Sequence, residues 1–235
     1  MNALHEMDFN VGLDLVIHSP GGYVSATESI IHYLRKKFEH NIRVFVPQIA
    51  MSGGTILALS GEEIWMGHHS NLGPIDPQFG NRPAVTLIAE FKKAFKEVKK
   101  DNSKLSVWHP ILAQIAPTQL SQAQDAIDLS KQIAQRALIE GMFRKDQNKE
   151  KKAKKVADEL TKVTVHKQHS RHIHFDDCRN IGLNVVRLED EPILQDAVLS
   201  AHHAFTITLS NTAAAKIIQN HLGATFVKNA PSNMV

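Results

Sequence analysis

Two consecutive strand–loop–helix units, each with paired glycines in the loop, constrain what this chain can fold into. The first joins the apolar run 13–18 to a helical stretch, 23–38, through Ser-Pro-Gly-Gly at 19–22. The second joins the β-branched run 42–46 to an apolar helix that begins at Thr55, through Met-Ser-Gly-Gly at 51–54. Strands that alternate with helices in this way predict an α/β fold with parallel strands.

Ser52 lies at the apex of the second loop, where a strand-to-helix turn lifts a hydroxyl off the sheet edge. Glycine tolerates the crowded backbone of such a turn, and the amides of Gly22 and Gly53 are then free to face one point. This pattern predicts a serine nucleophile with an oxyanion hole formed by those two amides. It is not the Gly-x-Ser-x-Gly of α/β-hydrolases, because position 50 is Ala. The alternative is a serine N-cap with a glycine-rich packing turn.

Three ordered motifs resemble the serine dehydrogenase proteinase family. They are the two loops above, the second extended to Thr55, and Gly-Pro-Ile-Asp-Pro-Gln at 73–78. The segment 170–174, followed by Gly182 and Leu183, resembles the closing motif of the family. The family is related to signal-peptide peptidase A and to the proteolytic subunit of Clp protease, all on the crotonase-like fold. The resemblance covers most of the chain.

The resemblance implies an α/β fold of the crotonase and Clp-protease type, a spiral of strand–strand–helix units with a helical C-terminal arm. We assign residues 1–190 to the protease domain and 191–235 to the arm. Relatives carry strands before the first glycine loop, so we expect N-terminal strands of this domain to be missing. We also expect a homo-oligomer, because the helices after residue 117 carry more apolar surface than one lobe covers.

A serine hydroxyl needs a base within hydrogen-bond reach, and the resemblance implies either a histidine held by an aspartate or a neutral lysine. Lys104, fifty-two residues after Ser52 and ahead of Pro117, fits the lysine version best. Burial near Leu105 would have to lower the pKa of its amine. The alternatives for the base are Lys93, His68, His69, His169 and His172.

Length and charge bound the other possibilities. A chain of 235 residues with a net charge of +3 lacks the footprint of a dedicated nucleic-acid binder. No apolar run approaches a membrane span of about 20 residues, so we expect membrane association only through a substrate or partner. The single cysteine, Cys178, excludes an internal disulfide and predicts a reducing, cytoplasmic compartment. No cofactor is expected.

The remaining segments are assigned by their periodicity. Helices are expected at 82–100, with an apolar stripe opposite lysines, and at 117–144. The charged run 143–155 is expected to be a solvated helix–turn–helix, not a nucleic-acid patch. A last strand is expected at 185–188, and the C-terminal arm is expected to contain helices at 194–205 and 212–222.

A histidine-rich segment near the end of the domain is the one candidate metal site. It includes His166, His169, His172, His174 and Cys178. The spacing of these side chains fits no standard zinc pattern, and a helical turn at 176–180 would scatter them. We therefore predict no metal.

The sequence favours a serine endopeptidase that acts on peptides or unfolded proteins through an acyl-enzyme on Ser52, with Lys104 as its base. A non-catalytic peptide-binding or assembly subunit on the same fold is the alternative. An acyl-CoA hydratase or isomerase is disfavoured, because it requires paired glutamates at the two glycine loops, and these loops have none.

Overall fold

The computed structural model describes residues 2–39, 41–79, 82–162 and 171–231. Its main sheet has four parallel strands in the order β1-β2-β4-β8. The parallel α/β architecture expected from the sequence is confirmed, while the spiral arrangement of strand–strand–helix units stays a prediction. The strands are β1 (Leu13–Val16), β2 (Ile42–Val46), β4 (Glu63–Met66) and β8 (Val185–Arg187).

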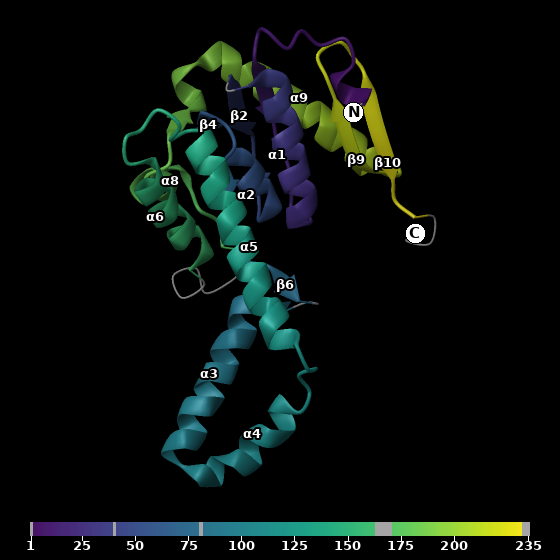
Figure 1. Cartoon of the computed structure of the whole chain (residues 1–235). Helices are drawn as coiled ribbons and strands as arrows, with labels where there is room; N and C mark the ends of the chain where they lie inside the picture. The colour runs from purple at the N-terminus through teal and green to yellow at the C-terminus, as the bar shows by residue number, and fades with distance from the viewer. Residues whose placement is uncertain (1, 40, 80–81, 163–170, 232–235) are drawn as a thin grey trace.

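Alternating side chains on β2 divide the core between the two faces of this sheet. Val44 and Val46 join the larger core, which contains residues of α1 (Val24–Phe38), α2 (Gly53–Ala58) and α5 (Gln119–Glu140). Phe45 points to the other face, where it stacks with Trp65 and packs near Val198 of α9 (Pro192–Asn211). Figure 1 shows α1, α2 and α5 on one side of the strands and α9 on the other.

A second, smaller layer of extended backbone gathers the sequence motifs. β3 (Ile49–Ala50) pairs in parallel with β5 (Asn71–Leu72). Ser19 bridges to Ala50 on one side of this pair, and Ile173 bridges to Leu72 on the other. The first glycine loop, the second glycine loop, the third motif and the 171–174 segment therefore follow one another across this layer.

A second projection, which we call the helical arm and which is distinct from the C-terminal arm, extends away from the head that contains the sheet (Figure 1). It consists of α3 (Ala84–Lys100), the short helix η2 (Asn102–Lys104), α4 (Leu105–Leu112) and the start of α5. Ala84 and Leu87 of α3 pack on Ala123 of α5 at the base of the arm. No residue of α4 is buried, even though the helix is largely apolar, and its side chains Leu105, Val107 and Ile111 are all exposed.

The charged segment after α5 forms the solvated helix expected from its composition. α6 (Lys149–Thr161) buries Ala153, Val156, Ala157 and Leu160 and exposes most of its lysines. α5 buries five of its ten apolar residues and leaves Leu129 45% exposed. After residue 117, further large apolar side chains are exposed on α9 and on the C-terminal hairpin, and others are exposed before it on the helical arm. The expectation of uncovered apolar surface after residue 117 is therefore wrong for α6 only.

The remaining elements are short. They are η1 (Asn2–Leu4), β6 (Gln78–Phe79), β7 (Arg82–Pro83), α8 (Phe175–Ile181) and η3 (Leu188–Asp190). α8 ends at Gly182, whose φ of 107° is a left-handed conformation that glycine adopts readily at the end of a helix. The helical turn expected before Gly182 is therefore confirmed. Within the part of the chain that is described, no helix is long and apolar enough to cross a membrane.

The helix expected at 212–222 is wrong. β9 (Ala214–Gln219) and β10 (Thr225–Asn229) form an antiparallel hairpin in which Phe226 pairs with Ile218. The run of alanines favours a helix locally, but the β-branched and aromatic residues after it pair across a turn. Asn220 closes this turn, since its side-chain oxygen accepts from the amides of Leu222 and Ala224. The C-terminal arm is thus one helix followed by a hairpin.

Candidate active site

Ser52 lies between β3 and α2 in a backbone conformation that serine rarely adopts. Its φ is 49° and its ψ is −112°. A positive φ at a residue other than glycine costs on the order of 1–3 kcal/mol and persists where the surrounding structure imposes it. Ser52 is the N-cap residue of α2, but its side chain makes no capping hydrogen bond. The alternative of a simple serine cap therefore does not account for this hydroxyl.

Backbone hydrogen bonds hold the first glycine loop against the second. The Ser19 amide donates to the Ile49 carbonyl at 3.0 Å, and the Met51 amide donates to the Ser19 carbonyl at 3.0 Å. The Ser19 hydroxyl also accepts from the Gly21 amide at 3.1 Å, which shapes the turn that follows. The strand-like segments before the two loops are therefore in register.

The glycines allow this close approach. Gly21 has a φ of 121°, and a Cβ built on it would lie 3.2 Å from the Cβ of Ser52. A Cβ on Gly53 would lie 2.9 Å from both the Gly22 carbonyl oxygen and the Thr27 hydroxyl. Any larger side chain at Gly21 or Gly53 would push the two loops apart.

The amides of Gly22 and Gly53 are uncommitted. Neither donates a hydrogen bond to any acceptor in the described ranges. As the first residue of α2, Gly53 has no partner inside its own helix. A Cβ on Gly53 would lie 3.2 Å from the Gly22 nitrogen, so the two amides are close neighbours. Free amides beside a hydroxyl are the donors that a developing oxyanion needs.

Thr55 ties the third motif to the second loop. Its hydroxyl lies 2.7 Å from the Ala50 carbonyl and 2.9 Å from the Gly73 carbonyl, and it accepts from the Gly73 amide at 3.1 Å. A Cβ on Gly73 would lie 2.7 Å from the Met51 side chain. The loop 73–78 is therefore packed beneath the turn that carries Ser52. Asp76 of this loop is buried, with 2% of its surface exposed.

The family model described as ClpP-like SDH-type serine proteinase matches residues 2–195. The chain belongs to this family. The match confirms the resemblance carried by the three motifs. It ends within α9, so most of that helix and the whole hairpin lie outside the family match.

Two curated relatives come from Methanocaldococcus jannaschii. Uncharacterized protein MJ0137 is 34% identical over 173 residues, which cover 74% of this chain and 53% of that protein. Uncharacterized protein MJ1495 is 31% identical over 185 residues, which cover 79% of this chain and 56% of that protein. The chain thus spans about half the length of these curated relatives. No solved structure matches the chain.

Lys104, the base expected from the family resemblance, is not brought to Ser52 within one copy of the chain. It ends η2 at the far end of the arm, whereas α2 lies in the head (Figure 1). The Lys104 amine pairs with Glu97 at 3.5 Å, and 46% of the side chain is exposed. In the isolated chain the Lys104 amine is therefore partly in water and paired with a carboxylate.

The other candidate bases are scattered. Lys93 lies on the arm, with its amine 5.9 Å from the centre of the Trp108 ring. His68 and His69 are exposed in the loop after β4. His172 is exposed beside Ile173, whose backbone pairs with Leu72 in the small layer that includes β3.

The histidine-rich segment, whose side chains were expected to be scattered, is only partly described. His166 and His169 lie outside the described residues. The rings of His172 and His174 are 6.3 Å apart, while Cys178 is fully buried on α8. The described ranges contain no group of three or more His, Cys, Asp or Glu side chains that could hold a metal ion.

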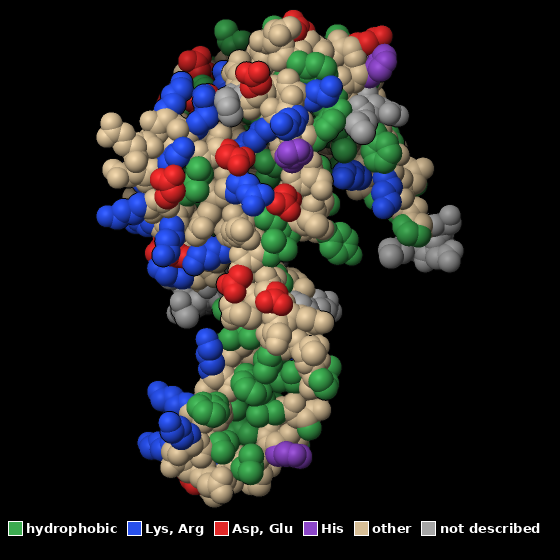
Figure 2. All heavy atoms as spheres, in the orientation of Figure 1, with side chains coloured by type: hydrophobic (Ala, Val, Ile, Leu, Met, Phe, Trp, Pro, Cys, Tyr) green, Lys and Arg blue, Asp and Glu red, His purple; other side chains and the backbone are tan. Residues whose placement is uncertain are grey.

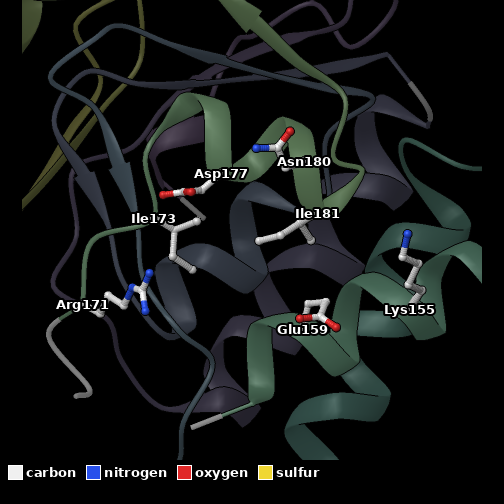
Figure 3. Close-up of a pocket in the computed structure, with 7 residues that line it drawn as sticks. All are labelled: Lys155, Glu159, Arg171, Ile173, Asp177, Asn180 and Ile181. Atoms are coloured by element: carbon white, nitrogen blue, oxygen red, sulfur yellow. The ribbon is translucent and has the colours of Figure 1, made fainter. Parts of the chain in front are cut away.

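Ser52 does not line either of two hollows in the surface of the head. One, of about 240 Å³, lies between α6, α8 and the segment before α8 (Figure 3). The other, of about 480 Å³, lies beside the end of α1. Neither includes a residue of the two glycine loops. The Ser52 side chain is half-buried in a single copy.

Three features of the site were not expected from the sequence. Gly21 adopts a positive φ, which was expected for neither glycine of the pair; the paired glycines were the signal available. Thr55 makes the connection between the second and third motifs, and only its place in Met-Ser-Gly-Gly-Thr hinted at a role. Tyr23 follows Gly22 directly and is 86% exposed, which no local pattern indicates.

Proposed function

We propose that this chain is a serine peptidase that hydrolyses peptide bonds through an acyl-enzyme on Ser52. The observation that carries the proposal is the strained, uncapped Ser52 beside the free amides of Gly22 and Gly53. Membership in the ClpP-like SDH-type serine proteinase family supports the same chemistry. Peptides or unfolded proteins are the proposed substrates, because the matching family is described as one of serine proteinases.

In the proposed mechanism, Ser52 Oγ attacks the carbonyl carbon of the scissile peptide bond while a base takes the hydroxyl proton. The amides of Gly22 and Gly53 donate to the oxygen that becomes negative, which lowers the energy of the tetrahedral intermediate. The intermediate collapses when the C–N bond breaks and the base returns its proton to the leaving amine. Water then attacks the ester on Ser52 by the same route and releases the second product.

We retain Lys104 as the proposed base, in a Ser–Lys dyad. The arm of one copy holds Lys104 away from its own α2, so Lys104 would serve the Ser52 of a neighbouring copy. Assembly would also have to remove Lys104 from water, because a charged amine cannot accept the proton. His172 is the alternative within one copy, since its segment pairs with β5 in the small layer.

A fluorophosphonate probe tests the nucleophile directly. We expect the purified chain to be labelled at Ser52, identified by mass spectrometry of the modified peptide, and we expect Ser52→Ala to abolish labelling. Ser19→Ala is the matched control, because Ser19 lies in the facing loop and its hydroxyl is already bonded to the Gly21 amide. No labelling of the wild-type assembly at Ser52 would favour a non-catalytic peptide-binding or assembly subunit.

The pH dependence of labelling identifies the base. Lys104→Ala should slow labelling by about 10²–10⁴-fold if Lys104 is the base, and His172→Ala should leave it nearly unchanged. With a lysine, the rate rises with pH to a plateau. A rise centred near pH 6.5 that disappears with His172→Ala would assign the role to His172 instead.

The division of the chain is part of the same proposal. We propose a protease domain over 1–190 and a C-terminal extension over 191–235, close to the point where the family match ends. We also propose a homo-oligomer in the cytoplasm, with no nucleic-acid partner.

A further inference from the structure

Four histidines gather where the C-terminal extension meets the head. His18 follows β1, His69 lies in the loop after β4, and His202 and His203 are on α9. The ring centres of His18 and His202 are 4.9 Å apart, and those of His202 and His203 are 5.9 Å apart. We call these four residues the histidine cluster. It belongs to neither glycine loop and has no part in the proposed chemistry.

His202 is the centre of the cluster. Only 8% of its surface is exposed, although histidine carries two polar nitrogens. It lies one turn after Val198, which packs with Phe45, Trp65 and Leu188 on the sheet. Val198 and His202 are the two buried residues of α9. The apolar contact and the histidine contact therefore attach this helix to the head together.

The groups that face His202 come from three elements, and all are histidines. His18 faces it from the end of β1, His69 from the β4–β5 loop and His203 from α9 itself. The pKa of His202 is lowered by burial first and then by the charges of these three neighbours. The pKa of His18 is also lowered by burial. Glu189 accepts from the His68 amide at 2.9 Å, and its charge acts on His68 and His69. Among the described residues, no carboxylate contributes to the lowered pKa of His18 or of His202.

We infer that the histidine cluster is a pH-sensitive latch that holds α9 and the β9–β10 hairpin on the head. At neutral pH His18 and His202 are uncharged, and their rings pack against each other. A proton added to either ring below that range places a positive charge beside the other histidines. The second half of α9 and the hairpin then release from the carboxyl end of β1.

The sign of the effect follows from the two lowered pKa values. His18 and His202 bind protons more weakly when docked than when released, where their pKa returns to about 6.5. Docking is therefore fully stable above about pH 6.5 and weakens as the pH falls through the docked pKa values. Because His18 immediately precedes Ser19, release also removes a neighbour from the first glycine loop.

Trp65 reports the latch. It packs with Val198 of α9, and a Trp108→Phe variant leaves it as the single tryptophan, since the chain has two. In that variant we expect the Trp65 emission to shift to longer wavelength between about pH 7 and about pH 5. Hydrogen exchange in α9 and the hairpin, corrected for the intrinsic rate, should rise by about tenfold or more over the same range. Exchange in β2 should stay constant.

Single substitutions locate the transition in the cluster. His202→Gln should abolish the transition or move it to lower pH. His18→Gln should move it in the same direction, and because His18 is exposed this variant serves as the test if His202→Gln folds poorly. His32→Gln, on the exposed side of α1, is the matched control and should leave it unchanged. EDTA should have no effect.

Four results would overturn the inference. The first is the absence of any transition in Trp65 emission or in α9 exchange. The second is a transition that His18→Gln and His32→Gln leave equally unchanged. The third is a rise of β2 exchange together with that of α9, which would indicate global unfolding. The fourth is a transition that EDTA shifts, which would assign the cluster to a metal instead of protons. None of these outcomes depends on peptidase activity.

Discussion

At the scale of single residues, the strained backbone conformation of Ser52 is the feature that most directly indicates function. A glycine in place of Ser52 would adopt a φ of 49° and a ψ of −112° without a clash between Cβ and the backbone. Natural sequences keep a strained residue where the side chain is needed. We therefore expect that a serine is kept at position 52, despite the strain, because its hydroxyl is needed for function.

This strain gives the first prediction. Ser52→Gly should raise the free energy of unfolding by about 1 kcal/mol, because the strain at a positive φ is relieved. Ser52→Ala keeps the Cβ and should change it by less than about 0.5 kcal/mol. Urea denaturation followed by circular dichroism measures both. A Ser52→Gly variant less stable than Ser52→Ala would mean that the Ser52 side chain stabilises the fold.

The two glycines of the expected oxyanion hole should respond differently to substitution. A Cβ on Gly22 meets no atom within 4 Å, so Gly22→Val should leave the fold intact while blocking the approach of a substrate. Labelling of Ser52 should then fall by about 10²-fold or more, as when an oxyanion donor is lost. Gly53→Ala should instead destabilise the fold by about 1–3 kcal/mol, since its Cβ meets two atoms at 2.9 Å.

Thermal denaturation and fluorophosphonate labelling separate these effects. Gly22→Val should lower the rate of labelling with an unchanged melting temperature. A loss of melting temperature in Gly22→Val as large as that in Gly53→Ala would assign Gly22 a structural role.

Cys178 should be chemically inert in the folded chain. Burial, and to a lesser degree the charge of Asp177, raises the pKa of its thiol to about 12. At pH 8 the reactive thiolate is then a negligible fraction of the folded population. Iodoacetamide should modify Cys178 only after denaturation, as followed by intact mass. Rapid modification of the native chain at pH 8 would show that α8 opens readily.

At the scale of elements, the arm is the part of the molecule that lacks a partner. α4 is apolar on nearly all sides, yet none of its residues is buried. In Figure 2, hydrophobic side chains gather over the middle of the arm and lysines along one edge. A helix that is apolar all round is normally found in an interior. We therefore expect another copy of the chain to cover this surface.

Polar substitutions on the arm test this expectation. Phe95 and Val107 are 67% and 64% exposed, and neither belongs to the core of the head. Phe95→Ser combined with Val107→Ser should convert the assembly to a single copy, while circular dichroism stays that of the wild type. Ile207→Ser, at a 61% exposed position of α9, is the matched control. Dissociation by the control but not by the arm variant would place the interface on α9.

At the scale of the whole molecule, the accessible surface is too large for a compact single copy. It measures 14220 Å². A compact monomer of 26.2 kDa exposes about 10,600 Å², so the excess is about 3,600 Å². A stable interface buries about 800 Å² on each partner. The excess is sufficient for more than one such interface per copy.

We therefore predict a closed homo-oligomer in solution. Light scattering on the eluting peak should give a mass that is a multiple of 26.2 kDa across micromolar concentrations. Hydrogen exchange in α4 should be slower in this assembly than in the arm variant. A wild-type mass of one copy at every concentration would contradict the prediction and would leave Lys104 unable to reach any Ser52.

Local signals in the sequence determined the strands, the glycine turns and the family motifs of this protein. Runs such as 42–46 are strands because β-branched and aromatic side chains pack well in a buried sheet, and paired glycines mark the tight turns that follow. The family match over 2–195 confirms what three short motifs indicated. These features depend on residues that are neighbours in the chain, so they can be read one segment at a time.

Tertiary structure alone decided what lies beside Ser52. The closeness of the Gly22 and Gly53 amides depends on the packing of two loops thirty residues apart, and the position of Lys104 depends on the direction of a whole arm. The hairpin after α9 likewise formed because Ile218 found Phe226 across a turn, against a local preference for helix. Pairing and packing between distant residues depend on contacts that no local window contains, and they fixed these features.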